Sequence, residues 1–142
     1  MITFIVALEG ITQVITYRPI ISSSREEIKL QGLKILKKLG LTLSVPAAGV
    51  IFVSRDSNIL RIDPVVWVRD IKTLFYETAC ASGTTAVALT EFFKQSKNTL
   101  EIPILQPSGK KLIARVKNLK QEVSAEIGGK IKILKKNLLL NI

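Results

Sequence analysis

The side chain best suited to chemistry is Cys80, the only cysteine in a chain that contains no histidine. It precedes a loop of small and hydroxyl residues, 81–85, which leads into the apolar stretch 86–93. Such a loop predicts a helix start, where hydroxyl groups cap and unpaired backbone N–H groups with the helix dipole attract anions. A thiolate is stabilised at this position, so we expect the pKa of Cys80 to fall below about 8.5.

Packing is the alternative role for Cys80, because free cysteines are among the most often buried residues. The position of Cys80 at a helix start favours a catalytic role over packing. Without histidine, a serine triad or a cysteine–histidine pair cannot form within the chain. Ser82 and Thr84 therefore fit capping and anion binding better than nucleophilic attack. No Gly-Lys-Ser/Thr follows the loop, which excludes a Walker motif, and one cysteine without histidine argues against a metal site.

The run from Glu77 to Ala86, ETACASGTTA, resembles the C-terminal active-site motif of diaminopimelate epimerase and its relatives. These are cofactor-independent amino-acid racemases and epimerases, and their motif places Cys-Gly-Ser/Thr-Gly before a buried helix. Ala81 stands here where that motif has glycine. The resemblance extends from residue 5 to about residue 132, and within the family the chain most resembles the histidine racemase subgroup.

The resemblance implies two similar domains, with the amino-acid substrate between two helix starts and a cysteine on each side of its α-carbon. One thiolate removes the α-proton and the other thiol returns a proton to the opposite face. Cys80 would be one of this pair. The substrate-binding residues implied for this chain are Glu77, Ala81, Ser82, Gly83 and Thr84. The chain would be the C-terminal domain, inactive without an N-terminal domain that carries the second cysteine.

Length and composition indicate one globular domain over residues 1–142, with 47% hydrophobic and 23% charged residues. The net charge of +10 could attract a polyanion, but the lysines are spread along the chain and no aromatic residues are interleaved with them. We therefore expect a basic surface without a nucleic-acid partner. No apolar run reaches membrane length, and a single cysteine suits a reducing compartment, so we expect a cytoplasmic protein with no membrane contact.

The elements that must position Cys80 follow from local patterns. Ser24 with Glu27 forms a capping box, and Gly40 ends the amphipathic helix that follows. The strand patterns cover residues 2–8 and 11–17, which form two strands or one strand broken at Gly10, and residues 48–54, 59–68, 100–105, 111–117, 121–127 and 130–134, with 138–142 as a last strand or a tail. A strand over 70–76 is implied by the resemblance to the histidine racemase subgroup. Pro64 predicts a bend or an edge, and Gly128-Gly129 predicts a hairpin turn.

These elements predict an α+β fold in which a curled, antiparallel-rich mixed sheet or barrel surrounds one central buried helix. Two functions stay open. The chain is a domain of a two-cysteine racemase or epimerase, or it is a non-catalytic binding or assembly module that retains this fold. The sequence also leaves open a homo-oligomer and the identity of the amino acid.

Overall fold

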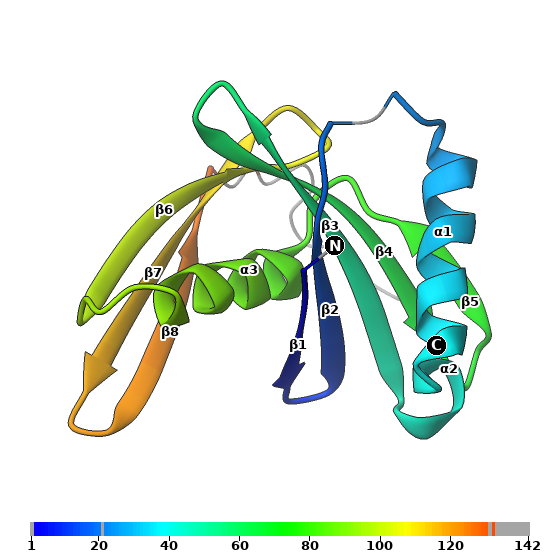
Figure 1. The fold of residues 1–142 in the computed structure, drawn as a ribbon, viewed down its shortest axis with the longest axis horizontal. Helices are drawn as coiled ribbons and strands as arrows, with labels where there is room; N and C mark the ends of the chain where they lie inside the picture. The colour runs from blue at the N-terminus through cyan, green and yellow to red at the C-terminus, as the bar shows by residue number, and fades with distance from the viewer. Residues whose placement is uncertain (1, 21, 131, 133–142) are drawn as a thin grey trace.

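The computed structural model describes residues 2–20, 22–130 and 132. These residues form an α+β fold with one mixed sheet of eight strands and three helices (Figure 1). The helices are α1 (Arg25–Lys38), α2 (Leu41–Ser44) and α3 (Ala81–Phe93). The strands are β1 (Thr3–Leu8), β2 (Ile11–Tyr17), β3 (Ala47–Asp56), β4 (Ile59–Val68), β5 (Thr73–Tyr76), β6 (Thr99–Leu105), β7 (Lys111–Leu119) and β8 (Glu122–Gly128).

The strands run in the order β1-β2-β3-β4-β6-β7-β8, and β5 also pairs with β4. The β2–β3 and β4–β6 pairs are parallel, and the other pairs among the described residues are antiparallel. One edge of β4 is shared by two strands: Leu60 and Arg61 pair with β6, whereas Val65 to Val68 pair with β5. Pro64, which has no N–H to donate, lies where the edge passes from one partner to the other. The predicted bend or edge at this proline is thus an exchange of partners within a central strand.

Both faces of the central strands are buried, which explains their nearly continuous apolar sequence. In β3, Val50 and Phe52 pack beneath α1, whereas Ile51 and Val53 face the core that contains Cys80. The alternation follows the two-residue period of a strand. The strand β3 therefore separates an α1 layer from an α3 layer.

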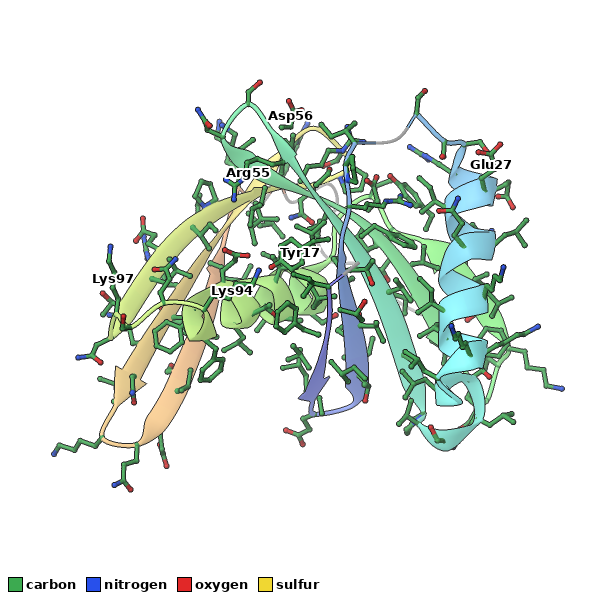
Figure 2. The ribbon with its side chains drawn as sticks, viewed as in Figure 1. Tyr17, Glu27, Arg55, Asp56, Lys94 and Lys97 are labelled. Atoms are coloured by element: carbon green, nitrogen blue, oxygen red, sulfur yellow. The ribbon has the colours of Figure 1, made fainter. Side chains whose placement is uncertain are left out.

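The helix α3 packs against β1–β4 on one side and β6–β8 on the other, and Figure 1 shows it lying between these two groups of strands. At its C-terminal half, Glu91 accepts a hydrogen bond of 2.5 Å from the Tyr17 hydroxyl. Lys94 bonds the same carboxylate at 3.1 Å and lies 3.7 Å from the centre of the Tyr17 ring. Tyr17 and Lys94 lie together beside this helix in Figure 2. These contacts fix the helix to β2.

The predicted capping of α1 is confirmed. Ser24 Oγ accepts from the Glu27 N–H at 3.2 Å, and Gly40 follows the helix with a φ of 70°. The short helix α2 comes next and was not predicted. Its four residues carry no amphipathic period that could reveal it.

The prediction of a barrel needs correction, whereas the hairpin turn predicted at Gly128-Gly129 stays a prediction because most of its second strand lies outside the described residues. The described sheet is not closed into a barrel, because β1 and β8 lie at its opposite ends and do not pair. The hairpin that leads into β8 turns at Lys120 and Gln121, both at positive φ, which is the conformation of a primed turn. The strand predicted over 130–134 falls largely outside the described residues, and the one predicted over 138–142 falls wholly outside them.

Candidate active site

Cys80 is the N-cap residue of α3, with an extended backbone at φ −138° and ψ 106°. Its Sγ accepts a hydrogen bond from the Gly83 N–H at 3.2 Å. Its carbonyl oxygen accepts from the N–H and the hydroxyl of Thr84, at 3.0 and 2.7 Å. A helix start is present, but it lies earlier than predicted: α3 begins at Ala81, so residues 81–85, expected to form a loop, make its first turn. The capping group is the cysteine sulfur and not a hydroxyl. The sulfur lies against the first turn of the helix.

Gly83 is required at this turn because there is no space for a side chain. A Cβ at this position would lie 2.6 Å from Ile51 Cδ1 and 3.0 Å from Cys80 Sγ. Such a contact would force the buried Ile51 side chain to shift or displace the sulfur. The small residue thus lets the thiol and the first turn approach each other.

The expectation of a lowered pKa for Cys80 is wrong. The side chain is only 3% exposed, and burial raises the pKa of the thiol to about 11. The Glu77 carboxylate raises this pKa further, while the Ser82 hydroxyl and the Gly83 N–H lower it. The two hydrogen-bond donors do not compensate for burial and the nearby negative charge. At neutral pH Cys80 therefore carries its proton.

Gln106 connects the end of β6 to the start of α3. Its side chain is 2% exposed, and its Oε1 accepts from the Cys80 N–H at 3.0 Å. Its Nε2 donates to Thr84 Oγ1 at 3.0 Å and to the Ile104 carbonyl at 3.1 Å. One buried amide therefore holds the backbone of Cys80 and the first turn of the helix.

Gln13 reaches the same turn from β2, and the sequence analysis missed it. Its side chain is fully buried, and its Nε2 donates to Ser82 Oγ at 3.0 Å. Ser82 Oγ lies 3.6 Å from Cys80 Sγ. A signal was present: Gln13 alternates with Ile15 and Tyr17 in β2, so it belongs to the apolar face that packs on α3. A polar residue on such a face indicates a buried hydrogen-bond partner.

The predicted anion-binding loop has fewer available donors than its length suggests. The N–H of Gly83 is bonded to sulfur, and that of Thr84 is bonded to the Cys80 carbonyl. In the described part of the chain, the N–H groups of Ala81 and Ser82 have no hydrogen-bond partner at this helix start. Glu77 lies close enough to the thiol to raise its pKa. The predicted residues do gather around Cys80, and the amides that lack a partner among the described residues belong to Ala81 and Ser82.

The described residues contain neither a metal-ligand cluster nor a membrane-spanning helix. Residues 2–20, 22–130 and 132 contain no group of three cysteine, aspartate or glutamate side chains that could hold a metal ion. Over the same residues, none of the helices has the length and apolar content needed to cross a bilayer.

Together, fold and site define an α+β domain with a single protonated thiol at the start of a helix packed on a mixed sheet. Comparison with known families matches residues 1–137 to the family described as the histidine racemase CntK N-terminal domain, and the chain belongs to this family. Histidine racemases from two Fusobacterium nucleatum subsp. nucleatum strains are similar to it. They are 33% identical (ATCC 23726) and 36% identical (ATCC 25586) over 75 residues. Each match covers 53% of this chain but 27% of the relative.

The comparisons support a racemase family but not the predicted domain position. The family model describes an N-terminal domain, whereas the motif around Cys80 suggested a C-terminal one. The motif resemblance rested on one helix start, and similar domains of one enzyme would each carry such a start. The likeness to diaminopimelate epimerase in particular is not confirmed.

Proposed function

We propose that this chain is one domain of an amino-acid racemase that uses Cys80 as one of two acid–base groups. The observation that carries the proposal is the position of the thiol, buried at a helix start beside the N–H groups of Ala81 and Ser82, which have no partner within the described part of the chain. The relatives are named histidine racemases, so histidine is the substrate to test first.

Racemisation needs a base on one face of the α-carbon and an acid on the other. Because Cys80 is protonated at neutral pH, its first role is that of the acid. A base on another domain removes the α-proton, and Cys80 donates its thiol proton to the opposite face. Cys80 is then a thiolate and the other group holds a proton. In the reverse direction Cys80 is the base.

The residues around Cys80 would bind the substrate and stabilise the carbanion. The N–H groups of Ala81 and Ser82, at the positive end of the α3 dipole, would bind the α-carboxylate. The same donors would stabilise the negative charge that spreads onto the carboxylate after proton removal. Glu77 would pair with the substrate ammonium group. That pairing would neutralise a charge that now raises the pKa of Cys80, so substrate binding itself would favour the thiolate.

The test is exchange of the histidine α-proton with solvent deuterium, followed by NMR. The 142-residue chain alone should give no exchange with inversion, because it has one cysteine and no histidine. Combined with a domain that supplies the second acid–base residue, it should racemise histidine. Cys80→Ser should abolish racemisation without unfolding the domain, whereas Ser96→Ala, at an exposed position after α3, should leave the rate unchanged. Racemisation that survives Cys80→Ser would overturn the proposal.

A non-catalytic binding or assembly module is the second candidate, favoured by the raised pKa and the burial of Cys80. The two candidates differ in one result. A non-catalytic module would remain inactive when it is combined with the second domain, although Ala81 and Ser82 could still bind an amino acid.

A further inference from the structure

We propose that Gln13 is a positioning residue for Cys80: by donating to Ser82 Oγ, it directs the Ser82 hydroxyl proton to the cysteine sulfur. This inference rests on the proposed function, in which Cys80 must become a thiolate during each turnover. It adds a residue of β2, 67 positions before the cysteine, to the groups that stabilise that thiolate.

The direction of the proton follows from the chemistry of the three groups. An amide NH₂ can only donate, so Ser82 Oγ is the acceptor of the 3.0 Å bond from Gln13 Nε2. The serine hydroxyl has a single proton to donate. Among the described residues, its remaining polar contact is Cys80 Sγ, at 3.6 Å. The proton therefore points to the sulfur, where it stabilises the thiolate more than the thiol.

The neighbouring hydroxyls behave differently, which makes the role of Ser82 specific. The hydroxyls of Thr84 and Thr85 bond the carbonyl groups four residues earlier, those of Cys80 and Ala81. The equivalent carbonyl for Ser82 is that of Thr78, which accepts a 2.9 Å bond from the Ser108 N–H instead. The Ser82 hydroxyl thus remains oriented by Gln13.

The other end of the Gln13 amide supports a role beyond packing. Its Oε1 is buried and has no hydrogen-bond partner among residues 2–20, 22–130 and 132. Gln13 lies opposite Gly49 in the β2–β3 register, and a Cβ on Gly49 would collide with this oxygen. An apolar side chain would fill the space without leaving an acceptor unpaired, so packing alone does not explain a glutamine here. The hydrogen bond that Nε2 donates to Ser82 explains why a glutamine is present.

The experiment measures the pKa of Cys80 in the full 142-residue chain. Cysteine labelled with ¹³C at Cβ gives one resonance, because the chain has one cysteine, and its chemical shift is followed against pH. Gln13→Met and Ser82→Ala should each raise the pKa, leaving about three- to tenfold less thiolate at a given pH. Glu77 keeps acting on Cys80 in every variant. Gln31→Met, on the exposed face of α1, is the matched control and should change nothing.

The double variant separates positioning from packing. If Gln13 acts through Ser82, Gln13→Met should have no further effect in the Ser82→Ala background. Ser82→Thr should leave the pKa of Cys80 close to that of the unmodified chain, since threonine keeps the hydroxyl that Ser82→Ala removes. The proposal would be overturned if Gln13→Met raised the Cys80 pKa equally in the unmodified chain and in the Ser82→Ala background. It would also be overturned if Gln13→Met did not raise this pKa at all. Should Gln13→Met not fold, Gln13→Asn shortens the side chain and loses the same bond. The titration needs no substrate, so its failure and a failure to racemise are separate results.

Discussion

At the scale of the residue, Cys80 is subject to opposing effects. The Gly83 N–H and the Ser82 hydroxyl stabilise the thiolate, whereas burial and the Glu77 carboxylate destabilise it. Burial is the largest of these, which is why the pKa rises to about 11 at a helix start where it was expected to fall. A helix start lowers the pKa of an exposed thiol effectively, but this sulfur is 3% exposed.

Glu77→Gln should lower the pKa of Cys80, because it removes a negative charge close to the thiol. The pKa should remain above that of free cysteine, about 8.5, since burial is unchanged. Titration of the Cβ resonance measures the shift, and Glu26→Gln, on the exposed first turn of α1, is the control. If Glu77→Gln and Glu26→Gln gave the same pKa as the unmodified chain, the assigned effect of Glu77 would be wrong.

At the scale of the element, the site depends on how β2, β6 and α3 meet. Gln106 at the end of β6 and Gln13 within β2 each place one buried amide on the first turn of α3. These bonds join segments that are 69, 26 and 22 residues apart in sequence. The start of the helix is therefore fixed by contacts of high sequence separation as well as by its own cap.

Gln106→Leu should destabilise the fold by about 1–3 kcal/mol, because the replacement leaves the Cys80 N–H and the Thr84 hydroxyl buried with fewer partners. Urea unfolding gives the free energy. Gln95→Leu is the matched control, since that glutamine lies exposed just after α3. Equal midpoints for Gln106→Leu and the unmodified chain would mean that the buried amide adds nothing to stability.

Local patterns predicted most of these elements but not their assembly. Ser24 and Gly40 marked the ends of α1, and the small residues after Cys80 marked the start of α3, because caps depend on neighbouring residues alone. The sheet order could not be predicted, since pairing of β4 with both β5 and β6 depends on distant contacts. The pKa of Cys80 was mispredicted for the same reason: its burial comes from Ile51 and the rest of a core assembled from several strands.

At the scale of the whole molecule, the net charge of +10 affects the free energy of unfolding more than the ion pairs that the structure shows. The ion pairs seen among the described residues, such as Lys29–Glu26 and Arg115–Glu101, include at least one partner that is a third or more exposed. Such pairs contribute about 0–1 kcal/mol each. An excess of positive charge instead destabilises the compact state through repulsion.

Salt should therefore stabilise this protein. Raising the chloride concentration from about 0.02 M to about 0.2 M shortens the Debye length and screens the repulsion between lysines, while little is lost from weak exposed pairs. The free energy of unfolding, measured by urea titration at each concentration, should rise. Replacing Lys110 and Lys111, exposed neighbours at the β6–β7 turn, with glutamine should reduce this salt dependence. A stability that falls as salt is added would show that the ion pairs, and not the net charge, dominate the electrostatics of the fold.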